Sequence, residues 1–521
     1  MVREKADLPL STMERHRGKK FSLLILIESL LVGFLAGLVV VAYRFALTQL
    51  SEMRNVLFAQ KHPVTLSLIL ILLIGAGYVV NLLLKWAPYS GGSGIPQIHA
   101  ELLGRIDYAT CPTLISKFFG GALNAFAGLS LGREGPSIQL GGTIGKLLGQ
   151  LLKLDRMDRA SLMAAGASAG LSAAFNAPLA GMLFVLEEIY GTFSSSVLVP
   201  ALLASLMANV VSFYCLGDQT AFHFRPTHLL DLSQLYLVLP LAILASLVGM
   251  SFNLLLDKWR AYAKRWPKLM DWRFSLLFLF SFGIWQVLPE IQGGGHSLVE
   301  ALAKSTFPLS FLCLLLVGKL VFTCISFDSG AQGGIFLPVL VLGATTGVVF
   351  QQLLLGFVNL ESYRVNFMII GMVAILTAVV RSPILSVVLI AEMTGTFSQF
   401  LSLSLASIVA YVFSESLKVE PVYHTLYKHL IANLPSRLPS GRQLSMMSRF
   451  CLPPDSKLTG KKLKDLKFPC PLLVTTIIRE GEEFVPEGED CLLLNDQVLV
   501  AHESGNGELV ETFFKQTLEK D

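Results

Sequence analysis

Hydrophobic positions along this chain gather in long blocks rather than alternating with polar ones. Apolar stretches occupy 21–41, 64–84, 235–255, 309–322, 335–357 and 401–413. A helix needs about 20 apolar residues to cross a bilayer, yet several of these stretches are shorter or are interrupted by Gly and Pro. Broken helices at membrane depth are tolerated where they are buried in protein or line a cavity. The pattern therefore predicts an all-α polytopic membrane protein, a transporter or channel rather than a bundle of plain anchors.

Three glycine-rich, proline-containing segments interrupt the apolar blocks, each followed by a stretch that could form a helix. They are 92–96 (GSGIP), 132–136 (GREGP) and 333–338 (GGIFLP). Glycine lets the backbone approach a ligand closely, and proline in a first helical turn loses no needed hydrogen bond. A helix start presents unpaired N–H groups and the positive end of a dipole, which favours an anion. These segments predict a dehydrated anion held by backbone amides.

The chain also repeats itself weakly. A shift of 202 positions places Lys117 on Lys319, Gly132 on Gly334, Pro136 on Pro338 and Gly141 on Gly343. A shift of 205 places Pro178 on Pro383 and Glu187 on Glu392. Two halves, about 21–215 and 232–430, with broken helices at matching positions are typical of an inverted-repeat transporter whose substrate binds where the halves meet.

After the second half the composition becomes polar. We expect the membrane domain to span 21–434, followed by a linker at 435–451 and a small soluble α/β domain at 452–521 on the cytoplasmic side. Its expected strands are 472–478, 483–486, 491–493 and 497–501, with a helix at 507–518.

Composition agrees with a membrane protein, because hydrophobic residues make up 53% and charged residues 15% of the 521 residues, and mean hydropathy is +0.62. The net charge of +4 gives no indication of nucleic acid binding. The basic N-terminal segment 1–20 is expected in the cytoplasm by the positive-inside rule, and the apolar run after it is too long for a signal peptide. The loops 153–159 and 258–268 are also basic and are expected on that side. Seven cysteines without a CxxC pair indicate free thiols rather than a metal site or disulfides, and no cofactor is predicted.

Two glutamates are the leading candidates for chemistry. Glu134 lies at an expected helix start, where its carboxylate can occupy the anion site and leave it when protonated, so that it acts as a gate and a proton carrier. The alternative is a helix cap or an ion pair with Arg133. Glu188 lies in an apolar helix, where an ionisable residue is a functional candidate. For Glu187 a structural place at the interface is favoured, because Glu392 repeats it.

Other candidates concern the anion itself. Ser93 and Tyr423 can each offer a hydroxyl, and Ile335 and Phe336 can offer backbone N–H groups. Lys117 and its repeat partner Lys319 could raise the local potential, form structural ion pairs, or extend to a helix end.

Together these motifs resemble the CLC family of chloride channels and chloride/proton exchangers over roughly 21–430. The resemblance implies a homodimer with one pore per subunit, built from some eighteen helices of varied length. It implies that Ser93, Tyr423 and the N–H groups of Ile335 and Phe336 coordinate the central chloride. It further implies that Glu134 is the external gate and Glu188 the internal proton-transfer residue.

Details of the motifs refine this expectation. Serine in the first motif resembles chloride-selective members, whereas nitrate-preferring members tend to carry proline and fluoride exporters depart from the serine and tyrosine pattern. Gln97 and His99 stand where prokaryotic relatives often have acids. The sequence therefore does not identify which residues carry protons on the inner side.

The segment 452–521 resembles the C-terminal half of an RCK domain (TrkA-C-like), through 458–463 (LTGKKL), 485–488 (VPEG) and 494–497 (LNDQ). This implies dimerisation or regulation by a small ligand.

The favoured interpretation is a secondary-active chloride/proton antiporter in the cell membrane with both termini in the cytoplasm. The alternative on the same scaffold is a passive gated chloride channel. A membrane-embedded enzyme is disfavoured because the chain has no HExxH, GxSxG or P-loop motif. A ligand sensor is disfavoured because the soluble tail is short.

Overall fold

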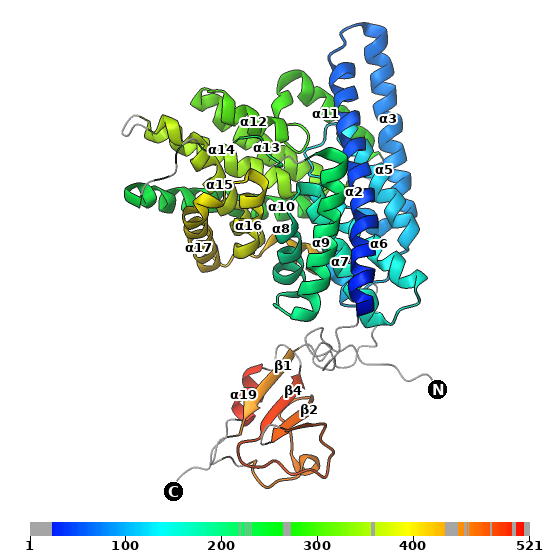
Figure 1. The fold of residues 1–521 in the computed structure, drawn as a ribbon, viewed down its shortest axis with the longest axis vertical. Helices are drawn as coiled ribbons and strands as arrows, with labels where there is room; N and C mark the ends of the chain where they lie inside the picture. The colour runs from blue at the N-terminus through cyan, green and yellow to red at the C-terminus, as the bar shows by residue number, and fades with distance from the viewer. Residues whose placement is uncertain are drawn as a thin grey trace. The chain divides into compact units, whose positions relative to one another are not determined.

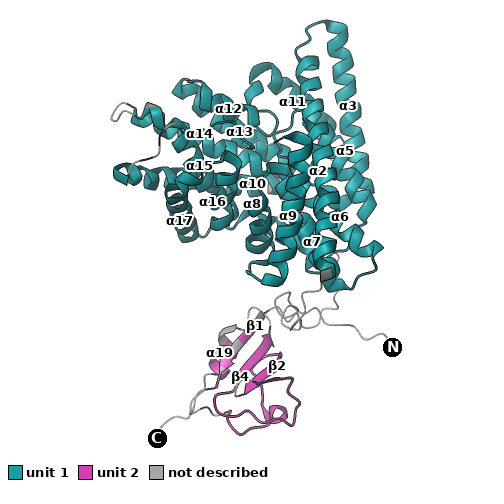
Figure 2. Ribbon diagram, in the orientation of Figure 1, with its two compact units in different colours: residues 1–433 teal, residues 434–521 magenta. Residues whose placement is uncertain are grey.

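The computed structural model describes residues 23–514 except 218–219, 225, 227, 229, 231, 264–271, 356–359, 433–445, 453–455, 457, 480–481 and 503–506. The chain forms two compact units, residues 1–433 and 434–521 (Figure 2). The basic N-terminal segment 1–20 and most of the expected linker lie outside the described residues.

The first unit is helical (Figure 1). Its first half contains α2 (Leu23–Phe58), α3 (Pro63–Trp86), α4 (Ile95–Leu102), α5 (Thr110–Phe126), α6 (Glu134–Leu151), α7 (Arg156–Phe175), α8 (Pro178–Phe184) and α9 (Ser195–Leu216). Its second half contains α10 (Val238–Ala263), α11 (Arg273–Val287), α12 (His296–Lys304), α13 (Leu309–Asp328), α14 (Phe336–Leu354), α15 (Arg364–Val380), α16 (Pro383–Thr394), α17 (Phe400–Ser416) and α18 (Val422–Ala432). Short helical turns are η1 (Pro88–Ser90), η2 (Val185–Tyr190), η3 (Leu232–Leu237), η5 (Pro289–Ile291), η6 (Glu361–Tyr363) and η7 (Phe397–Gln399).

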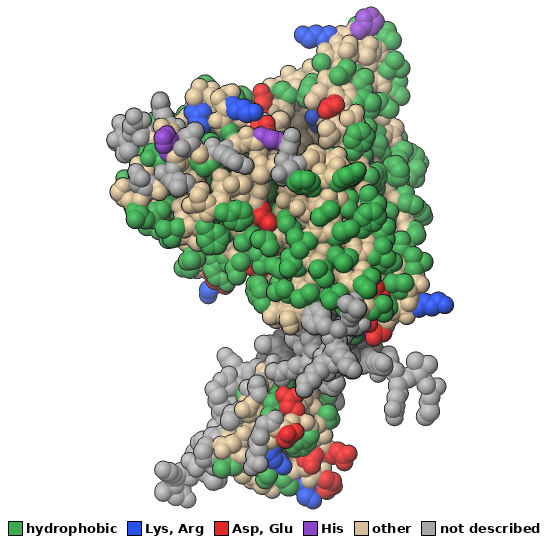
Figure 3. Space-filling view, in the orientation of Figure 1, with side chains coloured by type: hydrophobic (Ala, Val, Ile, Leu, Met, Phe, Trp, Pro, Cys, Tyr) green, Lys and Arg blue, Asp and Glu red, His purple; other side chains and the backbone are tan. Residues whose placement is uncertain are grey.

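The outside of this unit is apolar, as a lipid environment requires. Figure 3 shows hydrophobic side chains over much of its visible face. On α3, Leu68 is 61% exposed and Ile71 is 66% exposed. Among the described residues, seven helices are long and apolar enough to cross a membrane, at Leu24–Phe58, Pro63–Trp86, Ser195–Leu216, Leu232–Arg260, Leu309–Asp328, Phe336–Leu354 and Phe397–Ser416. The structure is therefore a polytopic membrane fold with many apolar helices, as predicted.

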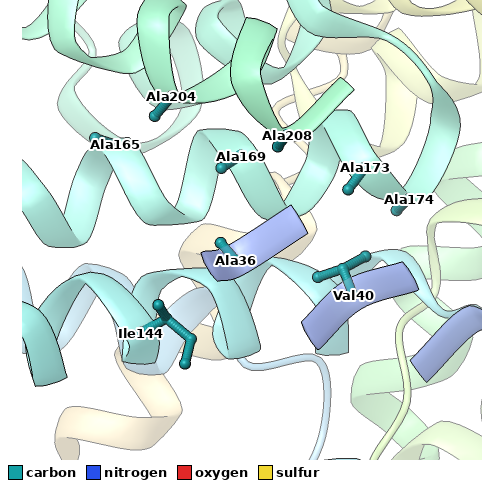
Figure 4. Close-up of a cluster of buried hydrophobic side chains, with 9 residues drawn as sticks. All are labelled: Ala36, Val40, Ile144, Ala165, Ala169, Ala173, Ala174, Ala204 and Ala208. Carbon is teal, nitrogen blue, oxygen red and sulfur yellow. The ribbon is translucent and has the colours of Figure 1, made fainter. Parts of the chain in front are cut away.

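Small residues let the helices of the first half pack closely. Alanines of α7 and α9 meet α2 and α6 in a cluster formed by Ala36, Val40, Ile144, Ala165, Ala169, Ala173, Ala174, Ala204 and Ala208 (Figure 4). Between α6 and α7 the backbones nearly touch, and a β-carbon added to Gly141 would collide with the carbonyl oxygen of Gly166. Lipid gives no hydrophobic drive to helix association, so this close backbone packing supplies van der Waals contact instead.

The second half repeats this arrangement at matching positions. There, a β-carbon added to Gly343 of α14 would collide with the carbonyl oxygen of Gly371 of α15. Gly343 is the residue that the shift of 202 pairs with Gly141. The sequence repeat therefore corresponds to a repeated packing contact.

The second unit contains one sheet of four antiparallel strands in the order β1-β4-β2-β3, with a helix, α19 (Gly507–Phe514). Strands β2 (Leu472–Arg479), β3 (Glu482–Phe484) and β4 (Gln497–His502) match three expected strands. Cys491, at the start of the fourth expected strand, forms only an isolated bridge with Lys462.

Strand β1 (Met446–Cys451) lies where the sequence was interpreted as linker, so the expected linker end at residue 451 is wrong. Met446 pairs with His502 and Cys451 with Gln497 of β4. The sequence does not reveal β1 because its partner strand, β4, lies far along the chain. The polar segment before β1 also continues into it without a change of composition that would mark where the strand begins.

A buried carboxylate ties the turn before β4 to strand β2. Asp496 is fully buried and accepts hydrogen bonds from Arg479 Nε at 2.9 Å, Arg479 Nη2 at 2.8 Å and the backbone N–H of Leu493 at 2.7 Å. The hydrogen bond to Asp496 raises the pKa of the Arg479 guanidinium, which keeps this partner charged.

We expect Asp496→Asn to destabilise the second unit by roughly 1–3 kcal/mol, because the buried carboxylate that pairs with the Arg479 guanidinium is replaced by a neutral amide whose NH₂ group cannot accept a hydrogen bond. In the full-length protein, protease cleavage within 446–514 should accelerate by on the order of tenfold, since cleavage follows the population of the opened unit. Asp465→Asn is the matched control, because Asp465 is exposed. Equal cleavage rates in both variants would show that Asp496 does not hold this unit together.

Candidate functional site

The three glycine-rich segments meet at the interface of the two halves. Gly132 and Gly334 exchange two backbone hydrogen bonds, of 2.7 Å and 2.8 Å. Gly92 donates to the carbonyl of Gly330 at 3.2 Å and accepts from Gly333 N–H at 3.0 Å. Segments that are far apart in sequence are therefore fastened backbone to backbone, as the repeat predicts for a site between two halves.

Each segment ends in a helix start. Helix α4 begins at Ile95, after Gly94 with a left-handed φ of 91° that glycine adopts readily. Helix α6 begins at Glu134 and helix α14 at Phe336. The first N–H groups of a helix have no acceptor within the helix, so these starts concentrate unpaired donors and positive dipole ends at one place.

Glu134 lies at the start of α6 and is fully buried. Neither carboxylate oxygen has a side-chain hydrogen-bond partner among the described residues, but the backbone N–H groups of Glu134 itself and of Leu337, at the start of α14, interact with the carboxylate. Its Oε2 lies so close to Gly132 that a β-carbon added to that glycine would collide with it. Arg133 acts on this carboxylate through its charge, without a direct ion pair among the described residues, and the helix-start N–H groups are those that a cap would use.

The candidate anion ligands lie around this carboxylate. A β-carbon added to Gly135 would lie 2.7 Å from the carbonyl oxygen of Ser93, and one added to Gly334 would lie 2.9 Å from the N–H of Gly135. The start of α6 is thus in contact with both neighbouring motifs. Ile335 caps α14, and Phe336 follows it as the first helical residue, both almost fully buried.

Tyr423 supplies the second buried hydroxyl. It is the second residue of α18 and is 4% exposed, and its hydroxyl has no hydrogen-bond partner among the described atoms. The charges of Glu188 and Glu134 both act on this phenol. Ser93 is equally buried, and its Oγ accepts a hydrogen bond of 3.2 Å from Ile95 N–H. The structure thus brings Tyr423 near both glutamates.

Glu188 lies in η2, a π-helical turn that continues α8. It is half-buried, and Ser382 Oγ donates to its Oε2 at 2.6 Å. Ser382 is the residue before α16 of the second half. π-turns inside helices are frequent at functional sites, and this one presents Glu188 to the interface between the halves.

The neighbouring Glu187 caps a helix of the opposite half. Its carboxylate accepts from the N–H groups of Ile384 at 3.1 Å and Leu385 at 2.6 Å at the start of α16. Glu392 does the same for α8, accepting from Leu179 at 3.1 Å and Ala180 at 2.8 Å. The two carboxylates thus satisfy each other's helix starts across the interface. The sequence predicts a structural role for Glu187 but not this reciprocity, although the shift of 205 pairs the two residues.

Lys117 and Lys319 hold the loops that lead to α4 and α12. Lys117 Nζ donates to the carbonyls of Ser90 at 2.9 Å and Gly92 at 2.7 Å. Lys319 Nζ donates to the carbonyls of Ile291 at 3.0 Å and Gly293 at 2.7 Å. Neither lysine forms an ion pair with a described residue, and neither side chain extends to solvent. Instead of the ion pair or the helix-end extension that the sequence suggested, each lysine holds two backbone carbonyls together.

We expect Lys319→Met to destabilise the helical unit by roughly 2–4 kcal/mol, because two buried carbonyls then lose charged donors. The variant should lose anion and proton flux together and melt at a lower temperature in detergent. Lys304→Met is the control, since the Lys304 side chain is 65% exposed. Loss of proton flux alone in Lys319→Met would contradict a purely structural clamp.

Two cavities approach the site. The first, of about 420 Å³, is lined by Ser93, Gln97, Arg260 and Arg273 together with the last turn of α18. Leu84, near the end of α3, also lines it, so it opens toward the end of the unit where α2 begins. Gln97 Nε2 donates to the carbonyl of Gly91 at 2.9 Å, and His99 is not among the lining residues.

The second cavity, of about 620 Å³, opens at the other end of the unit, beside the second half of α2. Arg44, Arg54 and Arg133 line it, and so does Gly132, next to Glu134. Glu52 also lines it, and three arginines against this carboxylate leave the cavity with a potential that attracts anions. A buried carboxylate thus separates a cationic cavity from the segment holding Ser93, an arrangement suited to gating an anion path.

Comparison with known proteins gives one consistent result. A family model described as voltage gated chloride channel matches residues 75–415. The H(+)/Cl(-) exchange transporter ClcA of Vibrio cholerae serotype O1 is 35% identical over 441 residues, covering 82% of this chain and 94% of that protein. ClcA of Salmonella arizonae is 33% identical, covering 79% and 90%.

Solved structures agree with this. The crystal structure of a slow cyanobacterial Cl⁻/H⁺ antiporter superposes with a TM-score of 0.75 at 29% identity, covering 80% of this chain and 99% of that chain. A CLC-type fluoride/proton antiporter at 24% identity has a TM-score of 0.67, which shows the shared fold alone.

Proposed function

This chain belongs to the voltage-gated chloride channel (CLC) family, and so is a membrane transporter rather than an enzyme; we propose that it exchanges chloride for protons across the cell membrane. The observation that carries the proposal is the fully buried Glu134 carboxylate at a helix start between two cavities, which faces the backbone N–H groups of Glu134 and Leu337 and has no described side-chain partner. The proposal is also supported by two of the similar proteins, which are named as chloride/proton exchangers.

In this proposal chloride binds between the helix starts. The hydroxyls of Ser93 and Tyr423 and the N–H groups of Ile335 and Phe336 coordinate it. Support comes from the burial of all four residues and from the unpartnered Tyr423 hydroxyl, which has a donor to offer. Backbone donors at helix starts bind anions without placing a cation in the path.

Glu134 acts as the external gate and proton carrier. Ionised, it occupies the anion position and closes the path; protonated, it leaves and chloride passes. Burial against the backbone N–H groups of Glu134 and Leu337 supports this role, because the ionised carboxylate then occupies a place suited to an anion and no described side chain fixes it there.

Glu188 transfers protons on the inner side. Support comes from its half-buried place in a π-turn, where the Ser382 hydroxyl donates a hydrogen bond to it. The charges of Glu188 and Glu134 both act on the Tyr423 phenol, which links the two glutamates electrostatically. Gln97 and His99 stand where an acid could have carried the proton further inward, so we propose that water in the first cavity, which Gln97 lines, carries it there.

The surroundings of the transport unit are part of the proposal. We place both termini in the cytoplasm on the basic N-terminal segment, and treat the protein as a homodimer. The unit at 434–521 is proposed to be an RCK-C-like regulatory domain that dimerises or binds a small ligand. A buried core and a complete four-stranded sheet support its being a separate folded module.

Purified protein in chloride-loaded liposomes tests the function. When a chloride gradient is imposed and proton movement is recorded with a pH electrode, we expect protons to move uphill, driven by chloride. Chloride flux without any proton movement would instead identify a passive gated chloride channel on the same scaffold.

A further inference from the structure

Three side chains capable of binding a metal converge beside the second cavity, which two of them line. His223 Nδ1 lies 2.8 Å from Glu300 Oε1, and His296 Nε2 lies 3.5 Å from the same oxygen. One ligand atom from each residue falls within 4.8 Å of the other two. We refer to His223, His296 and Glu300 as the histidine cluster.

The cluster joins two separate parts of the fold. His223 belongs to the connection between α9 and α10, while His296 and Glu300 lie one turn apart on α12. Both histidines line the second cavity, the one that reaches Gly132 and Arg133 beside the Glu134 gate. A ligand held by the cluster would therefore sit on the entrance to the proposed gate.

The backbone around each histidine is fixed. Phe222 donates its N–H to the carbonyl of Met393 at 3.0 Å, and its ring stacks on the His296 imidazole at 5.1 Å with an interplanar angle of 12°. The loop before His296 is clamped by Lys319 through the carbonyl of Gly293. Both imidazoles are thus presented by anchored segments, as metal ligands require.

The chemistry of the set fits a borderline transition metal. Two imidazole nitrogens and one carboxylate oxygen are ligands that zinc takes in open sites, with the fourth position left to water. The present separations allow closure to Zn–N and Zn–O distances of about 2.0–2.2 Å by side-chain rotation. Calcium and magnesium are disfavoured because they prefer all-oxygen sites.

The competing interpretation is an ion-pair network. Lys304 Nζ lies 3.6 Å from Glu300 Oε2, and Glu300 also contacts His223. The Lys304 side chain is 65% exposed, however, and exposed pairs contribute little energy. It contacts the second carboxylate oxygen, so Oε1 stays between the two imidazoles.

We propose that His223, His296 and Glu300 bind one zinc-class divalent metal ion from the solution on this side of the membrane, and that the bound ion slows ion movement through the second cavity. The ion would link the α9–α10 connection to α12 and narrow the entrance. The binding part stands on the cluster's geometry; the effect on flux rests on the proposed transport function.

Binding is tested on tag-free, full-length protein in detergent. Calorimetric titration with ZnCl₂ should give one saturable site per chain, and CoCl₂ should produce the visible absorption of four- or five-coordinate Co²⁺. His223→Gln and His296→Gln should each weaken Zn²⁺ binding at least about tenfold, the smallest loss seen when support of a metal site is removed. His228→Gln is the matched control, because His228 lies on the same connection but outside the cluster.

Several results would overturn the site. Absence of a one-equivalent Zn²⁺ isotherm, or equal affinities in His223→Gln and His228→Gln, would do so. Melting temperatures measured without metal identify a variant that has lost its fold, and Glu300→Gln then serves as the second ligand variant.

Flux provides the second readout. In liposomes, Zn²⁺ added on the side of the second cavity should slow chloride flux of the wild type and of His228→Gln, and should lose this effect in His223→Gln. Equal slowing of all three would contradict the inference, as would binding without slowing. Because binding is measured in detergent, failure of the site is distinguishable from failure of the transport proposal.

Discussion

Glu134→Gln is expected to keep moving chloride while its proton flux falls by at least about 100-fold, the scale of a positioned proton-transfer group. Glutamine resembles the protonated glutamate in shape and charge but cannot release a proton. The carboxylate is fully buried and has no described side-chain hydrogen-bond partner, and the amide oxygen of glutamine can still accept from the backbone N–H of Leu337. Parallel chloride-electrode and pH-electrode recordings from liposomes measure both fluxes.

The matched control is Glu52→Gln, the same substitution at an exposed residue of α2 that lines the second cavity but lies away from the helix starts of the site. It should keep both fluxes. Proton-coupled chloride flux persisting in Glu134→Gln would refute the gate, while loss of both fluxes with an unchanged melting temperature would mean that the carboxylate is needed for anion passage itself.

Glu188→Gln is expected to abolish proton movement while chloride still passes. The amide can still accept the hydrogen bond from Ser382 Oγ, so the π-turn keeps its contact with α16 while the titratable group is lost. The same pair of electrodes measures this variant, and proton flux should again fall by about 100-fold or more.

Glu187→Gln separates proton transfer from structure, because Glu187 lies in the same turn but caps α16. Weakening a cap costs roughly 1 kcal/mol, so this variant should melt earlier and change both fluxes alike. If Glu188→Gln also lowered both fluxes equally, its role would be structural.

The sequence located the helix starts of the site because Gly and Pro mark them chemically. In the structure, helices α4, α6 and α14 begin within the segments that contain Ser93, Glu134 and Phe336, respectively. The repeat shift also predicted that Gly132 and Gly334 occupy equivalent places, and they pair directly. The roles of Glu134 and Glu188 themselves remain predictions.

Features that depend on contacts between distant segments were not predictable. Reciprocal capping by Glu187 and Glu392 requires knowing that α8 and α16 face each other. Strand β1 is recognised only through its pairing with β4. His223 lies in the connection between the two halves and His296 lies in the second half, so no repeat or motif brings them together before the fold is known.

The central claim is tight coupling of chloride to protons, and a reversal-potential measurement tests it most directly. Purified protein in a planar bilayer is held at a fixed chloride gradient while the pH gradient is varied. Chloride/proton exchange predicts that the zero-current potential shifts systematically with the pH gradient, because both ions contribute to it. A zero-current potential that stays at the chloride equilibrium value at every pH gradient would contradict exchange and identify a channel.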